Sequence, residues 1–242
     1  MDRHLVIAGQ GRAGSTLLHS MLRHTLKGFE IPPSEAQALN YLNMPGNICT
    51  KRPFDIFDIP KILQAAQGKK HVDLIITLRD PRDILTSFHK KVPNDYFYSA
   101  DRSYFIPRNR EPERTARGFI PVHKAIMIVA TSGVFPQGVF LLKYEHLVAD
   151  PERIKAKLAD GLNLEFEGNF LDFHKQEIFE DHVSAMNGVR PVETTRQAKW
   201  KLPEHRARIL DQFTKHPELH DILIALGYET DTTWFENLSK LR

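Results

Sequence analysis

The sequence has 242 residues, of which 41% are hydrophobic and 26% are charged, an ordinary composition for a globular protein. The single cysteine, Cys49, excludes an internal disulfide framework and indicates a reducing compartment. The formal net charge of +3 suits an anionic ligand but is too small to indicate nucleic-acid binding.

No segment of the sequence indicates export or a membrane. The N-terminus lacks the basic and apolar regions of a signal peptide, and its first apolar run, residues 5–9, has only the length of a strand. No apolar run approaches the roughly 20 residues that span a bilayer. We therefore expect a soluble, cytoplasmic protein without an integral membrane segment. No feature predicts its oligomeric state.

Strands alternate with helices over the first two thirds of the chain. Apolar runs predict buried strands over His4–Gly9, Asp73–Leu78 and Val139–Tyr144, and a further strand is expected over Asn47–Lys51. The expected helices cover Ser15–Leu26, a segment that begins at Asp58, Pro81 to about Lys90, Thr115–Thr131, and Asp150 to about Asp160. This alternation predicts an α/β fold with a parallel sheet.

The rest of the chain gives a weaker pattern. Residues 93–112 are polar and aromatic and predict an ordered loop or lid. Residues 163–197 predict irregular structure with some helix, and two helices are expected over Pro203–Phe213 and Pro217–Leu226. Because the sequence has no repeat, low-complexity segment or convincing linker, residues 1–242 are expected to form a single domain.

Residues 9–16, GQGRAGST, join the first predicted strand to the first predicted helix. Glycines let the backbone curl so that several N–H groups point at one anion, and the following helix adds its positive N-terminal end. The spacing is similar to the P-loop of nucleoside triphosphatases, with Gly9, Gly14 and Thr16 in place. Ser15 replaces the lysine of that loop, which counts against phosphoryl transfer. Arg12 is the cation here and can grip an anionic group with two donors. A glycine-rich turn without a ligand is the alternative.

A second candidate anion site follows the predicted strand Asp73–Leu78. Arg79 comes directly after this strand, and Ser87 lies eight residues later, about two helical turns on. Ligands of open parallel sheets bind at the carboxyl ends of the strands, so Arg79 is expected to meet an anion there, with Ser87 as a hydroxyl donor. The alternative is a surface network of the arginines and aspartates in residues 79–83.

Together, GQGRAGSTLL (residues 9–18) and LRDPRDILTS (residues 78–87) resemble the two nucleotide-binding signatures of sulfotransferases that use PAPS (3′-phosphoadenosine 5′-phosphosulfate). The resemblance implies a P-loop-type three-layer α/β fold with a central parallel sheet flanked by helices. It implies PAPS as the donor and PAP (adenosine 3′,5′-bisphosphate) as the product. The residues that it assigns to the 5′-phosphosulfate are Gly11, Arg12, Ala13, Gly14, Ser15 and Thr16. It assigns the 3′-phosphate to Arg79 and Ser87.

Three shorter segments look like the protein-tyrosine sulfotransferase branch and related bacterial enzymes. They are TKRPF (residues 50–54), KYEHLV (143–148), and RPV with AKW (190–192 and 198–200). This resemblance implies that Lys51 lies near the reaction, that Tyr144 contacts the nucleotide, and that Arg190 belongs to a loop that closes over it. The chain departs from many cytosolic sulfotransferases, which carry lysine in the first loop and a catalytic histidine where this chain has Arg52 and Pro53.

Sulfuryl transfer requires positive charge at the leaving bridging oxygen, where negative charge builds in a loose transition state. Arg12 and Lys51 are the candidates for this role. No metal is needed, because the transferred group carries less charge than a phosphoryl group, and the sequence has no metal-ligand spacing such as H-x-x-x-H or C-x-x-C. Lys51 is alternatively a solvated charge at a strand end.

The acceptor hydroxyl requires a general base. Glu35 is the first candidate, because a glutamate in a comparable place serves as the base in the protein-tyrosine branch. Glu30, His123 and His182 are the alternatives. Glu35 is otherwise explained as a first-turn acid of a helix whose N-cap is Ser34.

Further candidates have open roles. Arg190, Lys199 and Ser184 are candidates to close or line the site. Tyr144 is either a nucleotide contact or a core residue, and Trp200 is better explained as an anchor of the C-terminal segment than as part of the site. The aromatic residues 96–98 and 104–105 either form a wall of an acceptor pocket or hold a loop in place.

The sequence therefore predicts a sulfotransferase that moves the sulfuryl group of PAPS to a hydroxyl or amine. A P-loop kinase or nucleotide hydrolase is one alternative. The missing loop lysine argues against it, and only Asp80 ends an apolar strand where Mg²⁺ would bind. A catalytically inactive nucleotide-binding protein is the other, and the joint presence of Arg12, Glu35 and Lys51 argues against that. A glycan, lipid or small metabolite is the expected acceptor.

Overall fold

The structure is a computed structural model, which describes residues 1–107, 110–135, 137–175, 180, 183, 186, 188, 191–193 and 197–240. The contacts divide the chain into two compact units. The first contains residues 1–78 and 122–194, and the second contains residues 79–121 and 195–242. Each unit thus combines two separate stretches of chain, and we describe each by itself. The single domain that the sequence suggested stays a prediction.

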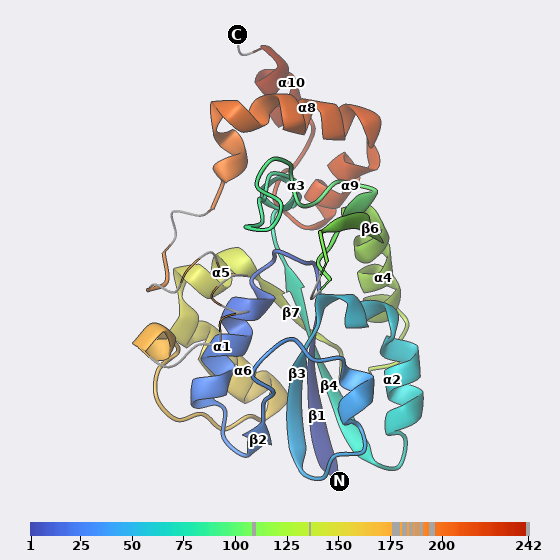
Figure 1. The fold of residues 1–242 in the computed structure, drawn as a ribbon, viewed down its shortest axis with the longest axis vertical. Helices are drawn as coiled ribbons and strands as arrows, with labels where there is room; N and C mark the ends of the chain where they lie inside the picture. The colour runs from blue at the N-terminus through green and yellow to red at the C-terminus, as the bar shows by residue number, and fades with distance from the viewer. Residues whose placement is uncertain are drawn as a thin grey trace. The chain divides into compact units, whose positions relative to one another are not determined.

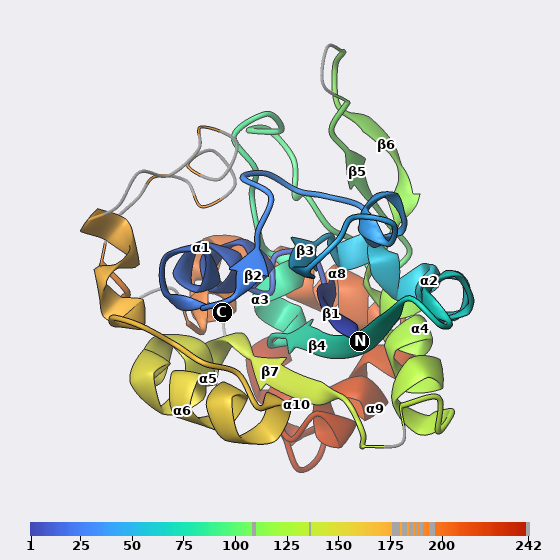
Figure 2. The ribbon, with the colours of Figure 1, turned by 90° about the horizontal axis from the view of Figure 1, so that it is seen from below.

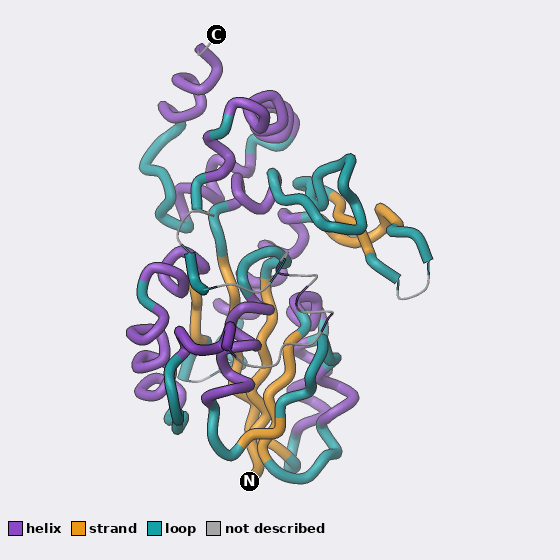
Figure 3. Tube along the Cα trace, turned by 60° about the vertical axis from the view of Figure 1, so that its left-hand side comes forward, coloured by secondary structure: helices purple, strands orange, loops and turns teal. Residues whose placement is uncertain are grey.

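A five-stranded parallel sheet forms the centre of the first unit (Figures 1 and 3). Its strands, in spatial order, are β2 (Phe29–Glu30), β3 (Asn47–Lys51), β1 (Asp2–Gly9), β4 (Lys70–Leu78) and β7 (Phe140–Lys143). All neighbouring pairs are parallel, so the carboxyl ends of the strands share one edge. The predicted strands are confirmed, although β1 and β4 begin before the predicted residues, and Tyr144 lies outside β7.

Helices cover both faces of this sheet (Figure 2). The helices on one face are α1 (Ser15–Thr25), α5 (Tyr144–Ala149) and α6 (Pro151–Leu162). Those on the other are α2 (Ile59–Ala66) and α4 (Phe119–Thr131), of which residues 122–131 belong to this unit. The short 3₁₀ helices of the unit are η1 (Ala38–Tyr41), η2 (Pro53–Phe57) and η3 (Phe170–Lys175). Leu5 and Ile7 of β1 are fully buried in one cluster with Leu22 of α1. The predicted three-layer arrangement is confirmed.

The second unit is built from short helices and a hairpin. Its elements are α3 (Pro81–Leu85), β5 (Arg102–Phe105), β6 (Glu113–Arg117), η5 (Lys199–Lys201), η6 (Pro203–His205), α8 (Arg206–Lys215), α9 (Glu218–Ala225) and α10 (Thr233–Lys240). The strands β5 and β6 pair antiparallel. Phe213 of α8 is buried and packs its ring edge-to-face against Trp234 of α10, with 4.9 Å between the ring centroids. Aromatic packing therefore holds α10, which the sequence analysis did not predict, against α8.

The helix predicted from Pro81 to Lys90 is wrong in length, because α3 ends at Leu85. The hydroxyl groups that follow it donate to its last carbonyl oxygens. Thr86 Oγ1 lies 2.8 Å from the carbonyl oxygen of Arg82, and Ser87 Oγ lies 2.7 Å from that of Ile84. Side-chain hydroxyls thereby satisfy carbonyls at the helix end.

The helix predicted over Thr115–Thr131 is also wrong at its start. Residues 113–117 form β6 and pair with β5, which lies inside the segment predicted to be a loop or lid. The helix begins only after Gly118, whose backbone runs so close to that of Arg102 and Asp101 that a Cβ atom would collide with it. Tertiary pairing therefore overrides the local helical pattern at this point.

His4 in β1 makes the first unit sensitive to acid. The side chain is fully buried, with Nε2 2.9 Å from Thr50 Oγ1. Burial, together with the positive charge of Lys70, lowers the pKa of His4 to about 4. A histidine with a lowered pKa stabilises the fold above its unfolded pKa, and this contribution is lost as the pH falls toward the folded pKa.

Between about pH 6.5 and pH 4, we expect His4 alone to lower the free energy of unfolding by up to about 3 kcal/mol. Chemical denaturation of the wild type and of His4→Gln across this range measures the effect as a difference in the slope of the free energy of unfolding against pH. His71→Gln is the matched control, because His71 lies on the neighbouring strand with a side chain that is 58% exposed. Equal slopes for the wild type and His4→Gln would contradict the prediction.

Candidate functional site

The loop from Gly9 to Ser15 turns sharply at the carboxyl end of β1. Gly9 has φ of +119°, and a Cβ atom there would lie 2.7 Å from the carbonyl oxygen of Thr77. Arg12 adopts φ of 63° although it is not a glycine, and Gly14 has φ of 82°. Left-handed backbone at a non-glycine residue costs free energy and concentrates at functional sites. These turns give the curled backbone that an anion cradle requires.

The loop leads directly into α1. Gly14 is the N-cap residue of this helix, and the first turn contains no acidic residue. The positive end of the helix dipole is therefore not neutralised from within that turn. Among the residues assigned to the phosphosulfate, Gly11, Ala13 and Ser15 are buried, whereas Arg12 and Thr16 are partly exposed.

Tyr144 supports the loop. It is the first residue of α5 and not part of a strand, so the predicted strand position was wrong. The reason is that β7 pairs with β4 only as far as Lys143, opposite Leu78. The Tyr144 ring is 8% exposed and packs against Gly14, where a Cβ atom would lie 2.6 Å from Cδ2 of the ring. Tyr144 thus packs against the loop as a core residue, and its contact with the nucleotide stays a prediction.

Gly14→Ala should destabilise the protein by about 2–4 kcal/mol, because it adds a collision with Tyr144 to the cost of a left-handed backbone. Gly28→Ala is the matched control, since Gly28 has φ of +71° with no atom within 4 Å of the added Cβ. Gly28→Ala should destabilise the protein by only about 1 kcal/mol, the cost of placing alanine in a left-handed backbone conformation. Chemical denaturation of both variants checks the difference. Equal losses would mean that the ring is not packed against the loop.

Lys51 and Glu35 form an ion pair at the end of β3. Lys51 Nζ donates to Glu35 Oε2 at 2.8 Å, and the two side chains are 4% and 52% exposed. Lys51 pairs in register with Ile7 of β1, two residues before the loop begins at Gly9. The two residues expected to supply the cation and the base are therefore in contact. Because the Lys51 ammonium is buried, loss of this partner without a replacement would leave its charge poorly compensated.

Glu35 lies in extended chain, because no helix begins at Ser34; the next element is η1, which starts at Ala38. The explanation of Glu35 as a first-turn helix acid is therefore wrong. Glu30, the second candidate base, ends β2 and lies opposite Ile48, three residues before Lys51 along β3. His123 is 6% exposed in α4, and burial lowers its pKa. His182 lies outside the described residues.

Asp55, which no motif in the sequence marks, orders the segment that carries Glu35. Its side chain is fully buried; Oδ2 accepts a hydrogen bond from the Ala38 amide at 2.8 Å, and Oδ1 faces Arg52 at 3.2 Å. Burial raises the pKa of Asp55 to about 6. Arg52 is thus engaged with a structural carboxylate.

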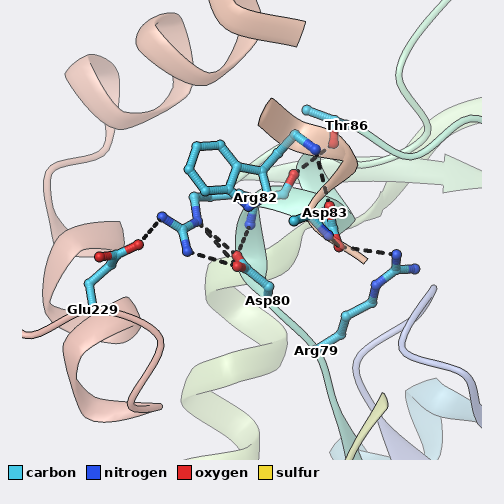
Figure 4. Close-up of polar contacts among 8 residues, drawn as sticks. Arg79, Asp80, Arg82, Asp83, Thr86 and Glu229 are labelled. Carbon is cyan, nitrogen blue, oxygen red and sulfur yellow. Dashed lines mark hydrogen bonds and ion pairs between the residues drawn. The ribbon is translucent and has the colours of Figure 1, made fainter. Parts of the chain in front are cut away.

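The second unit contains Arg79 and Ser87, which are predicted to hold the 3′-phosphate, and Figure 4 shows Arg79. Arg79 comes directly after β4, with a side chain that is 13% exposed and a guanidinium 3.3 Å from Asp83 Oδ2. Ser87 is partly buried just beyond α3, and its hydroxyl donates to the carbonyl oxygen of Ile84. The i, i+4 spacing of Arg79 and Asp83 is the sequence signal for this ion pair.

Asp80 and Arg82 form a buried pair in the same unit. Asp80 caps α3 by accepting from the Arg82 amide at 2.9 Å, and its carboxylate also accepts from the Arg82 guanidinium at 2.8 Å. That guanidinium contacts Glu229 and lies 3.8 Å from the centroid of the Trp200 ring. Trp200 is 6% exposed, so its interpretation as an anchor of the C-terminal segment is supported.

Several remaining candidates receive no role from the geometry. Arg190 and Ser184 lie outside the described residues. Lys199 is exposed in η5. Tyr96 stacks on Phe88, and Phe97 stacks on Tyr104 with 6.2 Å between centroids, so these rings hold one another in place.

Among the described residues, no group of three or more His, Cys, Asp and Glu side chains is arranged to hold a metal ion. Within the same residues, no helix has both the length and the apolar character needed to cross a bilayer.

The sequence matches no protein-family model and no curated protein. Among solved structures, the sulfotransferase domain of the olefin synthase from Synechococcus PCC 7002 superposes with a TM-score of 0.52 at 17% identity, over 84% of this chain and 89% of that one. The chain has a sulfotransferase fold. Mouse sulfotransferase SULT7A1, solved in complex with PAP, superposes with a TM-score of 0.54 at 11% identity, over 88% of this chain and 84% of that one. The fold implied by the two sequence signatures is therefore confirmed.

Proposed function

We propose that this protein is a sulfotransferase that transfers the sulfuryl group of PAPS to a hydroxyl or amine of its acceptor. The observation that carries the proposal is the contact between Lys51 and Glu35 at the end of β3, in register with the strand that enters the glycine loop. This contact joins a buried cation to a half-exposed carboxylate, which is the pair that sulfuryl transfer requires. The sulfotransferase fold supports the same conclusion.

The residues fit a 5′-phosphosulfate. The curled backbone at Arg12 and Gly14 and the N-terminus of α1 supply N–H donors for an anion without a metal. When bound, PAPS supplies the sulfuryl group and a PAP leaving group. Lys51 and Arg12 stabilise the charge that builds on the bridging oxygen as its bond to sulfur breaks.

Glu35 is proposed as the general base. It accepts the proton of the acceptor hydroxyl or amine while the new bond from that atom to sulfur forms, and the electron pair of the broken bond stays on the bridging oxygen, which leaves with PAP. Contact with Lys51 orients the Glu35 carboxylate before the donor arrives. When Lys51 turns to the bridging oxygen, the carboxylate becomes available to the acceptor.

Arg79 and Ser87 are proposed to bind the 3′-phosphate, which distinguishes PAPS from ordinary adenine nucleotides. A guanidinium is suited to a phosphate because its parallel N–H donors match two phosphate oxygens. Arg190 is proposed as a further nucleotide contact by resemblance. The proposed acceptor is a glycan, lipid or small metabolite, and no nucleic acid takes part.

A P-loop kinase or hydrolase is less well supported. Its loop lysine is replaced by Ser15, which is 4% exposed. Asp80, the aspartate placed to bind Mg²⁺, instead accepts hydrogen bonds from both the amide and the guanidinium of Arg82. The chemistry of these residues therefore favours a sulfuryl over a phosphoryl donor.

A thermal-shift comparison of PAP, ADP and ATP with Mg²⁺ tests the proposal. A ligand that binds only the native state at 100 times its Kd raises the free energy of unfolding by about 2.7 kcal/mol. We expect PAP to raise Tm clearly and ADP to raise it less, with no need for Mg²⁺. A shift with ATP and Mg²⁺ but none with PAP would overturn the proposal.

A further inference from the structure

A single buried carboxylate in the second unit contacts both Arg79 and the turn at residues 198–200 (Figure 4). The Asp83 side chain is 1% exposed. Its Oδ2 accepts from the Ala198 amide at 2.9 Å and from the Arg79 guanidinium at 3.3 Å, and its Oδ1 accepts from the Trp200 amide at 3.2 Å. Residues about 115 positions apart in the sequence are thereby joined through one side chain.

The turn at residues 198–200 needs an external partner to hold its shape. Ala198 adopts φ of 54°, in the left-handed region that alanine rarely populates. The two amides that donate to Asp83 flank Lys199, so the carboxylate fixes both sides of this strained backbone. Because Asp83 is buried, the loss of any one partner would leave its desolvated negative charge less well compensated.

Independent contacts keep Asp83 in place on α3. Arg82, its neighbour in sequence, is 3% exposed and lies against the rings of both Trp200 and Trp234, at 3.8 and 4.7 Å from their centroids. Its guanidinium also binds Asp80 and Glu229. The helix and the turn are thus held together by Arg82, which leaves the Asp83 carboxylate to orient the Arg79 guanidinium.

We propose that Asp83 is a positioning residue that orients Arg79 for the 3′-phosphate and couples its occupancy to the order of the turn at residues 198–200. The inference rests on the proposed function, because it assigns the 3′-phosphate to Arg79. The coupling is reciprocal: if the anchored turn helps Arg79 to bind a phosphate, a phosphate on Arg79 stabilises the turn by the same factor.

Asp83→Asn tests this role with little change in side-chain volume. The asparagine side chain keeps one acceptor oxygen. In place of the other oxygen it carries an NH₂ group, which cannot accept the hydrogen bonds that the carboxylate accepts. We expect the affinity for PAP, measured by calorimetry, to fall about tenfold or more, since one charge-assisted hydrogen bond has that effect on an equilibrium. The affinity for 5′-AMP, which lacks the 3′-phosphate, should change by less than about twofold.

Asp101→Asn is the matched control, because Asp101 lies in the same unit with a side chain that is 57% exposed. It should bind PAP as the wild type does. Unchanged PAP affinity in Asp83→Asn would overturn the inference, and so would an equal loss for PAP and 5′-AMP, which would indicate a merely structural role. Failure of the wild type itself to bind PAP would instead refute the proposed function, and the inference with it.

Limited trypsin digestion of the wild-type protein tests the coupling without any substitution, and decides the matter if Asp83→Asn does not fold. Trypsin cleaves after Lys199 and Lys201, which lie in η5 within or next to the turn. We expect saturating PAP to slow cleavage at these two sites several-fold, and saturating 5′-AMP to leave it unchanged. No protection by PAP, or equal protection by both nucleotides, would overturn the inference.

Discussion

Replacing Arg79 with alanine should weaken PAP binding by about 100-fold or more, equivalent to about 3 kcal/mol, while the affinity for 5′-AMP changes by less than about threefold. The 3′-phosphate loses a guanidinium with paired donors, and nothing else in the proposed assignment replaces that charge. Asp83 also loses a cation 3.3 Å from its buried carboxylate, so the turn at residues 198–200 should become less well held. Calorimetry with the two nucleotides measures the effect.

Arg102→Ala is the control for this prediction, because Arg102 belongs to the same unit with a side chain that is 70% exposed. Like Arg79→Ala, this change removes one positive charge, but it leaves the contacts of Asp83 unchanged. If Arg79→Ala weakens PAP and 5′-AMP equally, the 3′-phosphate is bound elsewhere, and the assignment of Arg79 and Ser87 is wrong.

Replacing Lys51 with methionine should lower kcat by about 10²–10³-fold. This is the loss found when one preorganised donor to a developing oxyanion is removed, about 3–4 kcal/mol in the transition state. The Lys51 side chain is 4% exposed, and methionine fills most of its volume, so no large cavity should form. Rates of sulfuryl transfer at saturating PAPS measure the effect, with Tm recorded for each variant.

Lys61→Met is the matched control, since Lys61 lies in the same unit with a side chain that is 74% exposed. Its kcat should stay within about twofold of the wild type, as surface substitutions rarely matter. If Lys51→Met keeps the wild-type kcat and loses only affinity for PAPS, Lys51 binds the donor without stabilising the leaving group. If its Tm also collapses, the ion pair with Glu35 is structural.

The sheet was predictable because its strands are buried on both faces. A residue in such a strand must be apolar whichever face it points to, so runs such as Leu5–Gly9 and Leu74–Leu78 stand out in the sequence. The alternation with helices then requires parallel pairing. The order of the strands was not predictable, because it depends on which long-range pairs form.

The two errors in the second unit have different physical causes. The segment around Thr115 has a local pattern that suits a helix, but its backbone groups are satisfied by pairing with β5. The helix from Pro81 ends at Leu85, where the hydroxyls of Thr86 and Ser87 share the carbonyl oxygens of Arg82 and Ile84 with backbone N–H groups. The strand at residues 113–117 does not follow from periodicity, because it depends on pairing with another segment of the chain.

Some residues of the candidate site could be located from the sequence, and others appear only in the structure. The positions of Arg12, Lys51 and Arg79 at or after the carboxyl ends of strands could be predicted, whereas their roles in binding and catalysis stay predictions. Tyr144 and Asp83 could not be assigned from the sequence, since their roles come from contacts with Gly14 and Ala198 respectively. Such supporting residues become visible only when the packing is known.

The most direct test of the central claim is the transfer of a labelled sulfuryl group from PAPS, measured in excess EDTA against pooled glycan, lipid and small-metabolite acceptors. The proposed function predicts transfer to at least one pool without a divalent metal, and a loss of about 100-fold or more in Lys51→Met. Transfer to no pool, together with hydrolysis of ATP by the same protein when Mg²⁺ is supplied, would contradict it.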